Sequence, residues 1–480
     1  MIIAELLKTD EGKTLEFKRD ISSPRNLLKT LVAFANTAGG RVIIGVEDKT
    51  RAPVGIDNPL DEEERLCNLI ADAISPRLVP NIEMTTVDGH TLLVVEVFLS
   101  NSRPHYLRSE GPESGVYVRL GSSNRQADRE LIAELRRSVE GVSFDELPLP
   151  QLSMDDLAVE AIKRIFTGVR EVDAQTLLTL KLLVREQGRI VPTKGGILLF
   201  GRDRLAHFPD CWVQCGRFIG EDKARIFDHI ELEEPLPVLV DSIMLFLKKH
   251  AMRGADFSKV RRRDVWDIPL EALREAVINA LVHADWSQRG GPARVAFFDD
   301  RIEVENPGIL PPGMTVEDMR QGVSKIRNPV IARVFRELKL IEQWGSGVPR
   351  IFRETAAAGF PEPYLVELGL RVRFIFPLTE LIKITEIPHP SQETQVTAQV
   401  TAQVTVQITV QIGEFCKEPR SAREIMEMLG LKHWKTFQSN YLNPVLEAGF
   451  IERTIPDKPN SRLQKYRLTV KGQDTLTAQK

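Results

Sequence analysis

The chain has 480 residues, of which 42% are hydrophobic and 27% are charged, and its net charge is −3. This composition is typical of a globular protein of about three domains, and it excludes a chain that is basic over its whole surface. Four cysteines are too few for a disulfide scaffold and suit a reducing cytoplasm. The first apolar run is too short for a signal peptide, and no stretch approaches the ~20 apolar residues of a membrane span.

The first 140 residues predict one unit of alternating helices and strands. Apolar side chains at helical spacing predict a helix over 27–38, which Gly39 and Gly40 end. A charged helix is expected from about residue 61, and a closing helix over 128–137. Four strands are expected, at 41–46, 82–87, 92–98 and 115–119.

This unit also contains acidic residues that could act on a phosphodiester. Glu11, Glu16 and Asp48 could hold a divalent metal if they converged at strand ends, with Lys18 stabilising developing charge. From spacing alone, solvated surface charges are the favoured interpretation. The metal, if present, would be Mg²⁺ or Mn²⁺.

The pattern around these residues resembles the AlbA-like core of the Schlafen family, in EFK at 16–18, FANTAGG at 34–40 and IGVED at 44–48. Nuclease-active Schlafens cut tRNA or other RNA with three acidic residues, and the matching positions are Glu11, Glu16 and Asp48, or Glu47 in place of Asp48. Gly12 departs from the family's usual Ser. Many bacterial relatives bind nucleic acid without cutting it, so cleavage, binding and a structural role all remain open.

The charge of this unit does not decide between those roles, because residues 1–137 contain 18 Lys and Arg against 21 Asp and Glu. A nucleic-acid groove would need its arginines, with Arg119 and Arg125 among them, to cluster on one face. Residues 151–265 are expected to form a middle α/β region, with a helix near 157–166 and strands at 196–201 and 211–218.

A third unit is expected over 266–380, with a helix at 269–284 followed by strands at 293–298 and 301–305. Glu275 and Asn279 would share one face of that helix, where Asn can ligate Mg²⁺ and Glu can take a proton from water. A glycine-rich turn at 345–347, before a new helix, offers backbone N–H groups to phosphate oxygens. Lys325 and Arg327 can add charge-assisted contacts.

Four blocks in this order, REAVINALVHADW, VENPGIL, KIRNP and WGSGVPRI, resemble the Bergerat-fold ATP-binding domain of gyrase, histidine kinases and MutL, in the divergent branch that follows Schlafen-type domains. The resemblance implies an α/β sandwich that binds ATP and Mg²⁺. It makes Glu275 the general base, Asn279 the Mg²⁺ ligand and Gly308 part of the adenine-side loop, with Gly345, Ser346 and Gly347 at the triphosphate. Asn306 stands where an Asp normally contacts adenine. The chain has no GxxxxGK[ST], which excludes a P-loop ATPase.

Residues 394–412 read TQVTAQVTAQVTVQITVQI, with apolar side chains at every second position. Strict period 2 with β-branched residues predicts an extended strand, here within 392–412, that would span roughly 60 Å. One apolar face needs a partner, so self-association into a homo-oligomer is expected, and a flexible linker is the alternative.

Residues 413–480 predict a winged helix-turn-helix. Ser421 is expected to cap a helix that starts at Ala422, with Glu424 completing the capping box. Wing strands are expected at 450–454 and 464–469. The module has 12 Lys and Arg against 8 Asp and Glu, and phosphate contacts are expected from Lys432, Lys435, Lys458 and Arg462.

The sequence therefore predicts a cytoplasmic multidomain protein of α/β and α+β class. It is expected to bind RNA or DNA, with ATP·Mg²⁺ controlling its assembly or its engagement of nucleic acid. Two alternatives remain. One is a metal-dependent RNase that acts in phage defence, and the other is a transcriptional regulator without catalysis.

Overall fold

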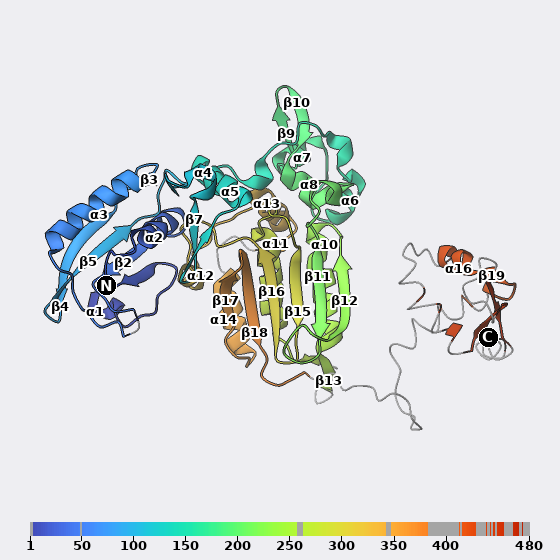
Figure 1. The fold of residues 1–480 in the computed structure, drawn as a ribbon. Helices are drawn as coiled ribbons and strands as arrows, with labels where there is room; N and C mark the ends of the chain where they lie inside the picture. Colours follow the sequence, from blue (N-terminus) through green and yellow to red (C-terminus); the bar gives the residue numbers. More distant parts are fainter. Residues whose placement is uncertain are drawn as a thin grey trace. The chain divides into compact units, whose positions relative to one another are not determined.

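The computed structural model describes residues 3–48, 50–256, 263–341 and 347–382, and in the C-terminal part chiefly residues 415–428, 449–455 and 464–469. The chain divides into two compact units, 1–385 and 386–480, which are described separately (Figure 1). The described residues form a mixed α/β structure with several sheets, as the sequence predicts.

The N-terminal domain is built on a four-stranded sheet in the order β1-β2-β5-β4, in which only β1 and β2 run parallel. Successive side chains of β2 point to opposite faces, so Val42 and Ile44 pack against α2 and α3, while Ile43 packs on the other side with α1. The elements are α1 (Ile3–Leu6), β1 (Leu15–Lys18), α2 (Pro24–Asn36), β2 (Gly40–Ile44), α3 (Pro59–Ala73), β4 (Asn81–Val87) and β5 (His90–Val97).

The end of this domain forms a smaller layer around helix α5. Asp128 caps the helix by accepting a hydrogen bond from Leu131 N at 2.8 Å, and Gly141 ends it with φ of 71°. The elements are β3 (Ile74–Ser75), β6 (Tyr106–Leu107), α4 (Gly111–Ser114), β7 (Tyr117–Leu120), β8 (Ser123–Gln126) and α5 (Arg129–Glu140).

A six-stranded sheet in the order β12-β11-β15-β16-β18-β17 organises the rest of the first unit (Figure 1). Two of its strands come from residues 151–265 and four from 266–380, and both stretches contribute to one hydrophobic core with α8, α10, α11 and α13. The strands are β11 (Val213–Phe218), β12 (Ile226–Leu232), β15 (Ala293–Phe297), β16 (Arg301–Pro307), β17 (Tyr364–Leu368) and β18 (Arg371–Pro377).

Helices and hairpins surround this sheet. The helices are η1 (Phe144–Glu146), η2 (Met154–Asp156), α6 (Val159–Ile165), α7 (Ala174–Thr179), α8 (Lys194–Phe200), α9 (Arg204–His207), α10 (Leu236–Ala251), α11 (Leu270–His283), α12 (Val316–Arg320), α13 (Pro329–Glu337) and α14 (Gly347–Ala357). The hairpin strands are β9 (Leu183–Glu186), β10 (Arg189–Pro192), β13 (Met252–Asp256) and β14 (Arg263–Trp266).

The strand expected at 196–201 is wrong, because this segment belongs to helix α8. Thr193 caps the helix by accepting a hydrogen bond from Gly196 N at 3.0 Å. The segment is buried on every side, so its residues are uniformly apolar and have no periodicity that could separate a helix from a strand.

In the second unit a small sheet has the order β19-β21-β20, with β19 (Arg420–Ser421), β20 (Ile451–Arg453) and β21 (Lys465–Leu468). Helix α16 (Ala422–Met428) follows Ser421, whose N and Oγ donate to Glu424 Oε2 at 2.7 and 2.8 Å. The capping box and the two expected wing strands are thus present. The winged helix stays a prediction, because residues 429–437 and 456–463 lie outside the described residues, as do residues 394–411 of the repeat.

Candidate functional site

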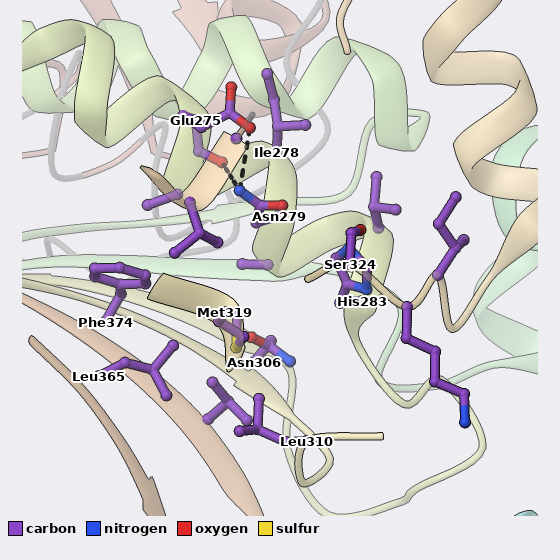
Figure 2. Close-up of a pocket in the computed structure, with 18 of the residues that line it drawn as sticks. Glu275, Ile278, Asn279, His283, Asn306, Leu310, Met319, Ser324, Leu365 and Phe374 are labelled. Atoms are coloured by element: carbon purple, nitrogen blue, oxygen red, sulfur yellow. Dashed lines mark hydrogen bonds between the residues drawn. The ribbon is translucent and has the colours of Figure 1, made fainter. Parts of the chain in front are cut away.

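A cavity of about 310 Å³ lies between helix α11, strands β16 to β18 and the segment from Ile309 to Ile326 (Figure 2). Most of its wall is apolar, including Leu310, Met319 and Phe374. Glu275, Asn279, Asn306 and Lys325 are among its polar residues. An apolar pocket with a few convergent polar groups is the usual form of a small-molecule site.

Glu275 and Asn279 lie one turn apart on α11 and are bonded to each other. Asn279 Nδ2 donates to the Glu275 backbone oxygen at 2.9 Å and to Glu275 Oε1 at 3.2 Å. Figure 2 shows the amide oxygen of Asn279 turned away from Glu275. This arrangement fixes a carboxylate beside an amide oxygen, which together can serve one cation and one water molecule.

Gly347, the first residue of α14, lies directly against this pair. A Cβ atom at this position would be 2.3 Å from Glu275 Oε1 and 3.5 Å from Asn279 Nδ2. Glycine therefore lets the start of an 11-residue helix lie against the carboxylate in this position, and a larger residue would require the Glu275 side chain or the helix to move. Gly345 and Ser346, expected at the same ligand, lie outside the described residues.

Asn306 and Gly308 have different positions around the cavity. Asn306 lines it, is buried, and donates through Nδ2 to Pro307 O at 3.0 Å. Gly308 has φ of 104° and donates through its backbone N to Leu370 O at 2.9 Å, and it is not among the lining residues. Gly308 therefore shapes the turn that presents the neighbouring residues.

Of the two expected cations, only Lys325 lines the cavity, where Nζ donates to Pro312 O at 3.0 Å. Arg327 does not line it. Its side chain donates to Ile309 O and lies 2.7 Å from Glu134 Oε1 and 3.6 Å from Asp285 Oδ2. Glu134 belongs to α5 of the N-terminal domain. Arg327, which the sequence predicted to contact the nucleotide phosphates, is therefore paired with a carboxylate of another domain.

Two charged residues that the sequence did not single out fix the apolar wall. Glu367 Oε1 accepts a hydrogen bond from Leu310 N at 2.8 Å, and Glu367 Oε2 lies 2.7 Å from Nζ of Lys13 in the N-terminal domain. Burial lowers the pKa of Lys13, and the Glu367 carboxylate opposes that shift. Lys13 and Glu367 are 354 positions apart, and a single sequence contains no signal that links them.

His283 also lines the cavity, at the end of α11. Burial and then the charge of Arg327 lower its pKa to about 4. The imidazole is therefore neutral at pH 7. It packs beside the site and is not expected to act as an acid there.

The N-terminal acidic residues do not gather as a metal site. Glu16 is 7% exposed and pairs with Lys18 and with Arg119, which is 1% exposed. Arg119 also donates to Gly12 O at 3.1 Å and to Asn124 Oδ1 at 3.0 Å. Arg119 is therefore a buried partner of Glu16 and is not available to phosphates on the surface, contrary to expectation.

The other two acids of the expected triad are exposed. Glu11 Oε1 accepts from Phe17 N at 2.8 Å, and Glu47, the alternative to Asp48, pairs with Arg19 at 2.8 Å. In the part of the chain that the structure covers, no group of three or more His, Cys, Asp or Glu could hold a metal ion. Within the same residues, no helix is both long and apolar enough to cross a membrane.

Of the residues expected to contact nucleic acid, Arg125 lies exposed on β8. The four expected in the C-terminal module lie outside the described residues, namely Lys432, Lys435, Lys458 and Arg462.

Three family models match separate stretches of the chain. Residues 11–128 match "Schlafen, AlbA_2", and residues 290–376 match "Putative ATP-dependent DNA helicase recG C-terminal". Residues 407–469 match "Filamentation induced by cAMP protein Fic-like, C-terminal domain". The second stretch contains the loop and strands of the cavity and begins just after α11. No curated protein matches the chain.

Among solved structures, the N-terminal domain of a RecG-related protein from Nitrosomonas europaea is 31% identical, covering 26% of this chain and 90% of that chain, with a TM-score of 0.22. The DIP2311 protein from Corynebacterium diphtheriae is 17% identical over 97% of this chain and 98% of that chain, with a TM-score of 0.40. A Fic family protein from Desulfovibrio desulfuricans is 16% identical over 72% and 77%, with a TM-score of 0.13.

Proposed function

We propose that this chain, which matches a Schlafen AlbA_2 model over 11–128 and a RecG C-terminal model over 290–376, binds nucleic acid under the control of ATP·Mg²⁺. The observation that supports the proposal best is the group of Glu275, Asn279 and Gly347 at one end of an apolar cavity. These residues come from two helices.

In this proposal each polar residue of the cavity has one role. Asn279 Oδ1 would ligate a magnesium ion, and Glu275 would orient the attacking water and take its proton if ATP is hydrolysed. Asn306, with the turn at Gly308, faces the base, and Lys325 faces a phosphate. The N-terminus of α14 and the glycine-rich segment before it, with Gly345 and Ser346, contact the triphosphate. Bound Mg²⁺ would neutralise phosphate charge.

Control of nucleic-acid binding is proposed because the cavity wall is also part of the interface with the N-terminal domain. Ile309 lines the cavity and packs in the cluster formed by Val116, Leu131 and their neighbours. Gly313 N donates to Thr37 O at 2.7 Å, and Thr37 Oγ1 accepts from the backbone N of Arg119. A ligand that moves this segment would therefore move contacts that lead to Glu16 and Arg119.

The nucleotide assignment is tested by titrating the purified chain with ATP in the presence of Mg²⁺. Asn279→Ala should weaken ATP·Mg²⁺ binding at least tenfold and leave binding of metal-free ATP nearly unchanged, because only the ion's ligand is lost. Asn81→Ala, an exposed amide on β4, is the matched control. Equal affinity of Asn279→Ala and the unaltered chain for ATP·Mg²⁺ would remove the assignment.

A further inference from the structure

A second cavity, of about 240 Å³, lies where the N-terminal domain meets the segment 325–328. Its walls come from α5, from the residues up to Phe144 that follow it, and from the loop containing Pro312. It shares Pro311, Lys325 and Ile326 with the larger cavity, so the two are neighbours. Of the residues that line it, only Lys325 has a role in the nucleotide proposal.

Three cations gather at this cavity. Arg137 and Lys325 line it, and Lys194 lies beside it, with Nζ 4.1 Å from the centroid of the Phe144 ring. The Arg137 guanidinium lies 5.4 Å from the same ring. The charge of Glu134, which also lines the cavity, acts on both Arg137 and Lys325. Burial lowers the pKa of Lys194, and the charge of Arg137 lowers it further.

Buried polar atoms without partners gather there too. Among the described residues, five buried side-chain atoms without a hydrogen-bond partner belong to residues that line this cavity, namely Glu134, Asp285, Arg327 and Asn328. The concentration indicates that the cavity accommodates a polar group.

Contacts between these residues account for three of the five atoms. Arg327 Nη1 lies 2.7 Å from Glu134 Oε1 in an ion pair. The carboxyl group of Glu134 interacts with that of Asp285, and burial, opposed by Arg327 and reinforced by Asp285, raises the pKa of Glu134 to about 7. Two of the five buried atoms still have no hydrogen-bond partner among the described residues, namely the donor Arg327 Nε and the acceptor Asn328 Oδ1.

We propose that this cavity binds a small phosphate-bearing anion in its monoprotonated form. Arg137 and Lys325 balance the negative charge, a phosphate oxygen accepts from Arg327 Nε, and the P–O–H group donates to Asn328 Oδ1. Glu134 and Asp285 also line the cavity, and they disfavour a fully ionised ligand. A small ligand fits better than a nucleic-acid backbone, because Arg327 and Asn328 are buried and only a group that enters the cavity can reach them.

The test is calorimetric titration of the full chain with inorganic phosphate and with pyrophosphate, at constant ionic strength. Saturable phosphate binding is expected, at least tenfold weaker in Arg137→Gln and largely restored in Arg137→Lys. The control Arg136→Gln removes the neighbouring exposed cation of α5 and should bind like the original chain. Asn279→Ala should also bind phosphate normally, which separates this site from the nucleotide proposal.

Three outcomes would overturn the inference. The first is equal phosphate affinity in Arg137→Gln and the original chain, with both shown to be folded by thermal unfolding. The second is loss of phosphate binding in Asn279→Ala, which would place the ion in the larger cavity. The third is the absence of saturable phosphate binding. If Arg137→Gln then weakens binding of an oligonucleotide, the cavity faces nucleic acid, and if it does not, the cavity is a water-filled space.

Discussion

At the scale of single residues, the candidate site depends on the absence of a side chain at Gly347. The Glu275 carboxylate occupies the space that a Cβ atom at this position would need. The helix spacing of Glu275 and Asn279 could be predicted from the sequence, since i and i+4 always share a face. The contact of Gly347 with Glu275, 72 positions earlier, follows from the packing of α14 on α11 and could be anticipated only through the family resemblance.

Gly347→Ala should therefore weaken ATP·Mg²⁺ binding about tenfold, because the new methyl group displaces the Glu275 carboxylate or shifts the start of α14. Gly12→Ala is the control, since a Cβ at Gly12 meets nothing within 4 Å. Nucleotide titration and thermal unfolding measure the effect. Unchanged affinity in Gly347→Ala would mean that the carboxylate does not face the nucleotide.

The acidic residues of the N-terminal domain differ in what they stabilise. Glu16→Gln leaves Arg119 buried without a counter-charge, and the free energy of unfolding should fall by about 3–5 kcal/mol. Asp48→Asn, at an exposed position, should change it by less than about 0.5 kcal/mol. Denaturant unfolding compares the two variants. Equal stabilities of the two variants would contradict a structural role for Glu16. A separate assay tests the nuclease alternative: cleavage of tRNA with Mg²⁺ or Mn²⁺ that is lost in Asp48→Asn would support it.

Asp145 gives a prediction about pH. Its Oδ2 accepts from the backbone N atoms of Val330 and Ile331 at 2.7 and 3.0 Å, yet burial raises the pKa of the carboxyl to about 7. Because the folded pKa lies above the unfolded value, this contribution to stability is complete below about pH 4 and is lost as pH rises through 7. Asp145→Asn should remove roughly 4 kcal/mol of pH dependence between these limits. An unchanged difference in unfolding free energy between pH 4 and 8 would contradict this prediction.

At the scale of elements, the segment between β16 and α12 is where the two domains of the first unit meet. From the sequence, this segment was expected to contact the strand before it and the glycine-rich motifs that follow it. Thr37 of the N-terminal domain bonds this segment directly, through Gly313 N. Lys13 and Glu134 of the same domain act through Glu367 and Arg327, which bond to Leu310 N and Ile309 O of the segment. Long-range ion pairs of this kind have no periodicity, so no pattern within a single element predicts them. The same limit explains α8, whose apolar residues contain no spacing signal.

Lys13→Met tests whether the N-terminal domain positions the cavity wall. The change leaves Glu367 buried without its cation, so the backbone at Leu310 should shift and ATP·Mg²⁺ should bind several-fold more weakly. Lys8→Met, at an exposed position in the same domain, should have no effect.

A double change separates the ion pair from general destabilisation. Adding Glu367→Gln to Lys13→Met removes the unpaired charge and should restore part of the stability, while the amide oxygen can still accept from Leu310 N. Purely additive losses of stability in the double variant would show that the two residues act independently.

At the scale of the whole molecule, the family resemblances identified a Schlafen-like AlbA domain and a Bergerat-type ATP-binding domain. The matches to the Schlafen AlbA_2 model over 11–128 and to the RecG C-terminal ATPase-type model over 290–376 confirm them. The sheet joins residues 151–265 and 266–380 through the parallel pair β11 and β15, which a sequence pattern cannot show. The proposed oligomer through residues 394–412 stays a prediction. Deleting this repeat should lower the mass measured by light scattering, and an unchanged mass would leave it as a linker.

The central claim is that nucleotide and nucleic-acid binding are coupled through the shared wall. Fluorescence anisotropy of a labelled tRNA and a labelled DNA duplex, each titrated with the chain in the presence and absence of ATP·Mg²⁺, tests it most directly. At least a threefold change in Kd on adding ATP·Mg²⁺ is expected for one of them, and Asn279→Ala should abolish the change without altering the Kd measured in the absence of ATP. An identical Kd in both conditions, under concentrations where ATP·Mg²⁺ is shown to be bound, would contradict the account.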